Sequence, residues 1–169
     1  MELRIALTLI ALGLVPGCAI GQDNEADEGY APEIEAGPAF DRDIHNQSTT
    51  YGASIGAEAT VIQQWLELEA DVTRLTGAGR SELGFEFLLK KPFTLSQNTE
   101  LMLGLGPEVV RTTVNGVRTT PHSAEYLLDF QFWQTRNIGL YVEPGYGVGL
   151  GNSRGEHSFN ASVGILLRW

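Results

Sequence analysis

The stretch 159-FNASVGILLRW-169 decides the fold, because its residues alternate between two kinds along its whole length. One face of this stretch is apolar and carries Phe159, Ala161, Val163, Ile165, Leu167 and Trp169. The other face is smaller or more polar, with Asn160, Ser162, Gly164, Leu166 and Arg168. Successive side chains of an extended chain point to opposite faces, so the alternation predicts a β-strand.

Seven further segments upstream alternate in the same way and are separated by turn-forming residues. They span residues 30–40, 51–62, 65–73, 81–90, 99–110, 123–133 and 138–150. Each has about the length that a tilted strand needs to cross a bilayer. The longer connections expected between them include residues 91–98 and 112–122. With the last strand, the pattern predicts an all-β chain of eight antiparallel strands.

The two faces of these strands differ sharply in charge. The polar faces carry Glu33, Glu35, Glu58, Glu67, Glu69, Asp71, Glu82, Glu86, Glu108, Glu125, Asp129 and Glu143. The apolar faces are almost free of charge, and aromatic residues gather at both of their ends: Tyr30, Phe132 and Trp169 at one end, and Phe40, Tyr51, Tyr126 and Phe159 at the other. Such aromatic girdles are typical of a membrane barrel whose apolar face meets lipid. The alternative is a soluble or lipid-anchored lipocalin-like barrel that buries the apolar faces and binds an apolar ligand.

Over residues 29–169 this pattern resembles the small outer-membrane barrels of the OmpA and OmpX type. The resemblance implies an eight-stranded antiparallel up-and-down transmembrane β-barrel in the cell outer membrane of a Gram-negative bacterium. It implies a monomer in contact with outer-membrane lipid and lipopolysaccharide. In that family the last strand is the signal read by the barrel insertion machinery, which here would be carried by Phe159, Ile165, Leu167 and Trp169.

The N-terminal residues predict a cleavable signal peptide over 1–21. Arg4 precedes an apolar run at 5–15 that is too short to span a bilayer, and Ala19 and Gly21 suit the positions before a cleavage site. An acidic linker at 22–28 and the barrel at 29–169 follow. The alternative is lipidation at Cys18, because 15-VPGC-18 resembles a lipobox.

Composition excludes several classes of protein. A hydrophobic content of 43% is too low for a helical membrane protein, and the net charge of −10 argues against nucleic-acid partners. No two histidines have metal-ligand spacing, so no metal centre is predicted from them, and no cofactor is expected.

The polar faces predict an acidic row inside the barrel. A tight turn at 63–64 predicts Glu58 opposite Glu69, and a tight connection at 76–79 predicts Glu69 opposite Glu86. Opposed side chains lie about 5 Å apart at Cβ, so one or more of these three carboxylates should have a raised pKa, share a proton or hold a cation. Arg168 is expected to form an ion pair with Glu33 and Glu35 on the first strand.

Two basic residues lie at the end of the fourth segment, Lys90 as its last residue and Lys91 as the first of the connection. Lys90 has the parity of the polar face, but Lys90 and Lys91 together are interpreted as an interfacial anchor rather than a binding site.

The expected function is a structural or adhesive role, or a narrow pore that favours cations. A lipid A-modifying outer-membrane enzyme is a second alternative, because His157 and Ser158 superficially resemble the base and nucleophile of one such family. Neighbouring residues of a strand face opposite sides, however, so no catalytic residues are predicted.

Overall fold

The computed structural model describes residues 31–77 and 79–169. The predicted signal peptide, the acidic linker and Tyr30 lie outside the described residues. Within the described residues, no helix is long and apolar enough to cross a membrane.

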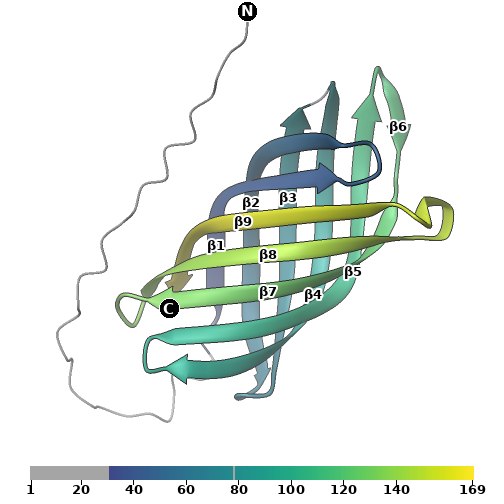
Figure 1. Cartoon of the computed structure of the whole chain (residues 1–169). Coiled ribbons are helices and arrows are strands. Elements are labelled where there is room, and N and C mark those ends of the chain that lie inside the picture. The colour runs from purple at the N-terminus through teal and green to yellow at the C-terminus, as the bar shows by residue number, and fades with distance from the viewer. Residues whose placement is uncertain (1–30, 78) are drawn as a thin grey trace, which may run out of the picture.

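Nine strands and one short 3₁₀ helix make up the described chain (Figure 1). In order they are β1 Glu33–Asp43, β2 Ser48–Ile62, β3 Leu66–Gly77, β4 Arg80–Ser96, β5 Thr99–Val114, β6 Val117–Thr119, β7 His122–Trp133, β8 Ile138–Leu150, η2 Gly151–Ser153 and β9 His157–Arg168. The three-residue β6 folds back on the end of β5, so eight long strands form the wall.

The sheet closes on itself. Each long strand pairs antiparallel with the next one along the chain, and β1 pairs with β9, where Glu33 lies opposite Arg168. The prediction of an eight-stranded antiparallel up-and-down barrel is therefore confirmed. One end of the barrel, the short-turn end, has connections at 63–65, 97–98 and 134–137, and the other, the loop end, includes connections at 44–47 and 151–156.

Several strands are longer than the sequence predicted, and β4 and β5 exceed their predicted lengths most. The expected connections at 91–98 and 112–122 are wrong over most of their length, since β4 continues to Ser96, β5 continues to Val114, and β6 occupies Val117–Thr119. The alternation in fact continues past Lys90, because Pro92 is buried and Phe93 is exposed. Pro92 also pairs with Met102 on β5.

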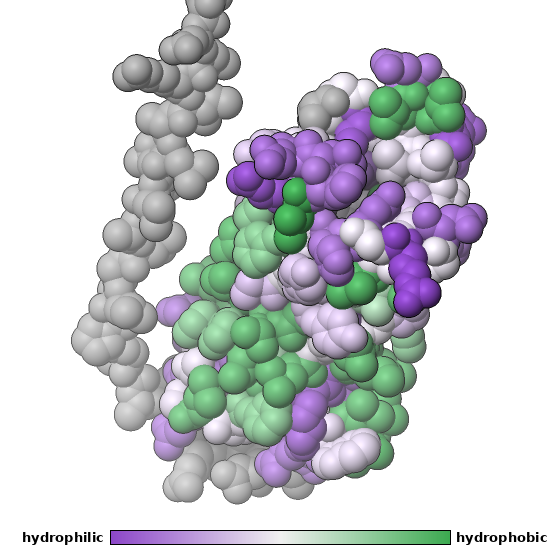
Figure 2. All heavy atoms as spheres, turned by 45° about the vertical axis from the view of Figure 1, so that its right-hand side comes forward, coloured by the Kyte–Doolittle hydropathy of each residue, from purple (hydrophilic) through white to green (hydrophobic). Residues whose placement is uncertain are grey.

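Large apolar side chains cover the outside of the barrel. Ile55 is 55% exposed, Phe85 51% and Ile165 52%, although these residues lie in the middle of their strands. Figure 2 shows a hydrophobic band across the lower part of the face in view, with hydrophilic side chains gathered above it. Monomeric soluble proteins rarely expose an apolar surface this extensive, so the band faces lipid. The alternative of a lipocalin-like barrel with its apolar faces buried is therefore wrong.

Three aromatic residues near the loop end pack against one another on the outside of the barrel. The ring of Phe40 lies 6.4 Å from that of Tyr51 and 6.0 Å from that of Phe159, measured between centroids. These three residues come from β1, β2 and β9, so the contact bridges the closing pair of strands.

The closing pair of strands approaches closely at two glycines. A Cβ atom on Gly164 would lie 2.1 Å from the carbonyl oxygen of Ala36, and one on Gly37 would lie 2.0 Å from that of Val163. The ring of Tyr141 covers Gly164 from inside the barrel, because its Cε1 would lie 2.7 Å from the same added Cβ. We call Gly37 and Gly164 the glycine seam.

Candidate functional site

A lysine lies at the centre of a buried acidic cluster in the barrel lumen. The Lys90 Nζ atom lies 3.1 Å from Oε2 of Glu58, 3.0 Å from Oδ2 of Asp129 and 3.1 Å from Oε2 of Glu143. It also forms an ion pair with Glu69. Lys90 and Asp129 are completely buried, and Glu69 is 1% exposed. These five residues are the Lys90 cluster.

The five residues of the cluster come from five strands, and each occupies a position whose side chain points into the barrel. Glu58 on β2 pairs directly with Glu69 on β3, and Lys90 reaches them from β4. Its long side chain also reaches Asp129 on β7 and Glu143 on β8. The interior of an eight-stranded barrel is just wide enough for side chains to fill, so opposite walls can meet. One ammonium group among four carboxylates leaves an excess of negative charge.

The structure changes the predicted acidic row. Glu58 faces Glu69 as predicted, but Glu69 lies opposite Leu88, and Glu86 lies opposite Asp71. The predicted Glu69–Glu86 pair is therefore wrong. The β3–β4 hairpin turns between Gly77 and Arg80, which shifts the register by two residues. An even shift keeps every side chain on its predicted face.

The interpretation of Lys90 as an interfacial anchor is also wrong. Lys91 occupies the interface, with its Nζ 5.7 Å from the ring centroids of Trp65 and Phe93 and a 2.8 Å hydrogen bond to the Gln64 carbonyl oxygen. The parity of Lys90 was the signal for a lumenal position.

Arg168 contacts one of its two expected partners. Its Nε atom donates to Oε1 of Glu33 at 2.8 Å, and its guanidinium carbon lies 3.9 Å from the ring centroid of Trp133. Glu35 lies instead toward the Lys90 cluster, where one of its oxygens is within 4.8 Å of oxygens of Asp129 and Glu143.

Bulky side chains fill the lumen around the cluster. Tyr141 is completely buried, Leu88, Met102 and Leu166 are each 1% exposed, and Trp133 is 8% exposed. The Tyr141 hydroxyl lies 3.4 Å from Oγ of Ser54, so it spans the lumen from β8 to β2. The middle of the barrel is consequently packed rather than hollow.

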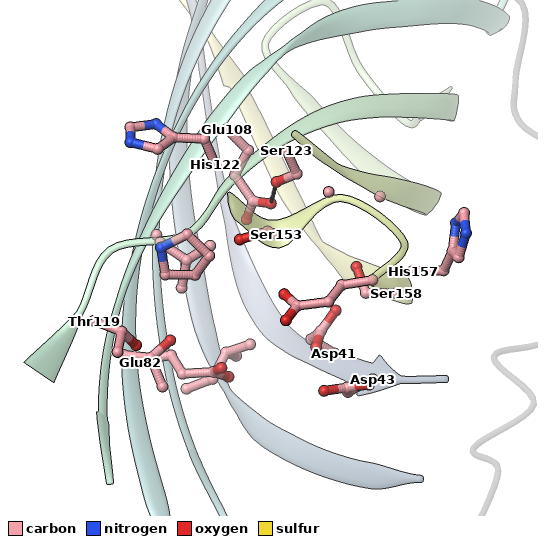
Figure 3. Close-up of a pocket in the computed structure, with 18 of the residues that line it drawn as sticks. Asp41, Asp43, Glu82, Glu108, Thr119, His122, Ser123, Ser153, His157 and Ser158 are labelled. Atoms are coloured by element: carbon pink, nitrogen blue, oxygen red, sulfur yellow. Dashed lines mark hydrogen bonds between the residues drawn. The ribbon is translucent and has the colours of Figure 1, made fainter. Parts of the chain in front are cut away.

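A cavity of about 240 Å³ opens at the loop end (Figure 3). Its lining is mostly acidic and polar, with Asp41, Asp43, Glu82, Glu108, Ser123 and Glu156. Arg80 partly balances this charge, since its guanidinium nitrogens lie 3.1 Å from Glu82 and 3.5 Å from Asp41 and Asp43. Ser123 donates to Glu108 at 2.7 Å. The cavity is therefore suited to cationic or polar groups.

His157 and Ser158 do not approach each other as a catalytic pair. In Figure 3 the His157 ring points away from the cavity, and its Nδ1 lies 3.1 Å from the hydroxyl of Tyr146 on the outside of the wall. Ser158 lies on the inner side, beside Gly147. This arrangement agrees with the expectation that neighbouring residues of the strand face opposite sides.

An eight-stranded closed barrel with an apolar outside and a charged, packed inside defines a transmembrane β-barrel of the outer-membrane type. Solved structures of such barrels are similar to this chain. Neisserial surface protein A (NspA) matches with a TM-score of 0.66 at 16% identity, covering 83% of this chain and 97% of its own. The outer membrane protein OprG from Pseudomonas aeruginosa matches with a TM-score of 0.65 at 9% identity, covering 83% and 96%.

Two further structures share the fold. Ail, the attachment invasion locus protein of Yersinia pestis, matches with a TM-score of 0.55 at 10% identity, covering 83% of this chain and 97% of its own. The outer membrane enzyme PagL matches with a TM-score of 0.51 at 15% identity, covering 81% and 99%. No protein-family model and no curated protein sequence matches the chain. At these identities the similarity shows the fold.

Proposed function

We propose that the protein is a closed structural barrel of the outer membrane rather than a diffusion pore. The packed lumen is the observation that carries this proposal. Lys90 draws carboxylates from opposite walls together, and Tyr141 spans the space beside them. Every side chain named in this barrier is buried to at least nine-tenths, apart from the partly exposed Glu143.

A structural role is favoured over an adhesive one by the size of the loop end. The connections there include 44–47, 115–116 and 151–156, and they give a macromolecular partner little surface. Standard protein–protein interfaces bury about 800 Å² on each partner. Ail is described as an attachment protein, but its likeness to this chain is one of fold.

The purified protein should carry no steady current in a planar bilayer at moderate salt. Ion-paired and aromatic side chains fill its lumen, so ions would have to displace Lys90 or Tyr141 to pass. The measurement is single-channel conductance of protein whose folding has been checked by its gel mobility before and after heating. Well-resolved, long-lived open levels from the wild-type chain would contradict the proposal.

A narrow cation-favouring pore is the second candidate. The excess of acidic over basic side chains in the lumen favours it. Glu108 lines the outer cavity, Glu86 lies opposite it on β4, and Glu125 is buried on β7. These three residues have no basic partner among the ion pairs of the described residues. If open levels are found, their reversal potential in a KCl gradient should show cation selectivity.

Lipid A modification has less support, because His157 and Ser158 lie on opposite faces of β9. Lipid A mass spectra from cells with and without the gene test this alternative directly. Identical spectra are expected.

A further inference from the structure

We infer that Glu35, Glu69 and Asp71 form a binding site for a divalent cation, best suited to Ca²⁺, in the barrel lumen. One oxygen from each of these carboxylates lies within 4.8 Å of the other two. Two oxygens bound to one Ca²⁺ at about 2.4 Å each are separated by at most about 4.8 Å. The three groups are therefore already spaced for a shared ion.

Gly56 allows the three carboxylates to approach one another. It lies on β2 directly opposite Glu35 on β1 and Asp71 on β3, so the two carboxylates flank a position without a side chain. A Cβ atom built on Gly56 would lie 2.9 Å from Oε1 of Glu69 and 3.1 Å from Oδ2 of Asp71. It would also lie 3.0 Å from Cγ of Glu35. The three acidic side chains thus converge above the glycine, and the interval between their oxygens, which we call the gap, is the place for the ion.

Two buried carboxylate oxygens of this site lack hydrogen-bond partners. Glu35 is 2% exposed and Glu69 is 1% exposed, yet Oε2 of Glu35 and Oε1 of Glu69 have no hydrogen-bond partner among the described residues. Buried polar atoms in folded proteins are nearly always paired. A buried carboxylate oxygen without a donor is strongly destabilising, and a bound cation removes that cost.

The other oxygens of the site are already engaged, which fixes how the carboxylates are turned. Thr73 donates to Oδ1 of Asp71 at 2.7 Å, which leaves Oδ2 toward the gap. Glu69 uses Oε2 for its ion pair with Lys90 and presents Oε1 to the gap. The cation site and the Lys90 cluster are therefore adjacent, share Glu69, and can be filled together.

The chemistry of the donors favours Ca²⁺ over Mg²⁺ and transition metals. All three donors are carboxylates, which are hard oxygen ligands and can bind through one or two oxygens. Ca²⁺ accepts such irregular sets of six to eight oxygens, whereas Mg²⁺ requires near-ideal octahedral geometry and retains its water. No histidine or cysteine contributes to the cluster as a softer ligand would.

Calcium titration of the folded, chelator-treated barrel in a nonionic detergent tests the site. Isothermal titration calorimetry should show one Ca²⁺ bound per chain, with Mg²⁺ competing at least tenfold more weakly. Gly56→Ala should weaken Ca²⁺ binding at least tenfold, although it removes no charge, because the methyl group fills the gap. Asp71→Asn should weaken binding by a similar factor through loss of a charged ligand.

Glu125→Gln is the matched control. Glu125 is also 1% exposed with an unpartnered Oε2, but it lies beside Asn160 and Gly145, outside the three-carboxylate site. This variant should bind Ca²⁺ as the wild type does. Gel mobility before and after heating, measured in EDTA, establishes that each variant is folded.

Three outcomes would overturn the inference. The first is a folded wild-type chain that binds no Ca²⁺. The second is equal affinity in the wild type, Gly56→Ala and Asp71→Asn, which would assign the binding to the acidic cavity at the loop end. The third is an equal loss of affinity in Glu125→Gln, which would indicate attraction by net charge alone. The test is independent of conductance, so it stands whether the barrel is closed or conducting.

Discussion

Replacing Lys90 with methionine should destabilise the barrel by about 3–5 kcal/mol, the usual cost of removing one partner of a buried ion pair. Methionine retains much of the length and the apolar stem of lysine but leaves Glu58, Glu69 and Asp129 without their shared counter-charge. Three carboxylates gathered around one ammonium would then repel one another in a buried setting. The free energy of unfolding in urea, followed by tryptophan fluorescence in detergent, measures the loss.

Lys91→Met provides the matched control for this prediction. It removes the same charge one residue further along β4, at the outer surface, where Lys91 contacts Trp65 and Phe93. Its cost should stay below about 1 kcal/mol, in keeping with exposed cation–π contacts. Combining Lys90→Met with Asp129→Asn should recover part of the lost stability. Equal stability of the two single variants would show that the carboxylates of the lumen do not depend on Lys90.

Gly164→Ala should be strongly destabilising, with a loss of about 3 kcal/mol or more. The new Cβ would lie 2.1 Å from the carbonyl oxygen of Ala36 and 2.7 Å from the ring of Tyr141. The closest obstacle is backbone of the partner strand, so relief requires β1 and β9 to separate. The folded fraction, read as the heat-modifiable band on a gel, and the free energy of unfolding both report the effect.

Gly84→Ala controls for the general cost of adding a methyl group inside the barrel. Its Cβ would lie 3.4 Å from Oε1 of Glu108 and 3.7 Å from Cβ of Thr73, which is close to ordinary contact. This variant should stay within about 0.5 kcal/mol of the wild type. If Gly164→Ala were tolerated equally well, the closing pair of strands would have room that the structure does not show.

Strand number, strand order and the inward or outward direction of each side chain could be predicted from the sequence. These properties depend on a period of two residues, which is visible along the chain. Phe85 and Phe87, for example, lie outside the barrel, and Glu82 and Glu86 point inward. Strand ends were less predictable, because the alternation of β4 continues through Lys91 and Pro92 without a change in character.

The lumenal contacts could be predicted only in part. The pairing of Glu58 with Glu69 follows from a short turn that joins their strands. The Lys90 cluster depends on two further quantities: the register of the β3–β4 hairpin, and the stagger that places β4 across the lumen from β7 and β8. Neither the register nor the stagger can be derived from the local alternation of apolar and polar residues. The parity of Lys90 predicted its face, and the structure was needed to show its partners.

The glycine seam has a consequence for the order in which the barrel folds. The other long strands pair with sequence neighbours through short hairpins, whereas Arg168 and Glu33, which meet where β1 and β9 join, are 135 residues apart in the sequence. Loop-closure entropy grows with sequence separation, so the local hairpins should form first and this ladder last. Until then the sheet has two unpaired edges that can template aggregation. Gly37 and Gly164 allow the close approach of strands in this ladder, so a side chain at either position should oppose the step that removes the last open edges of the nascent sheet.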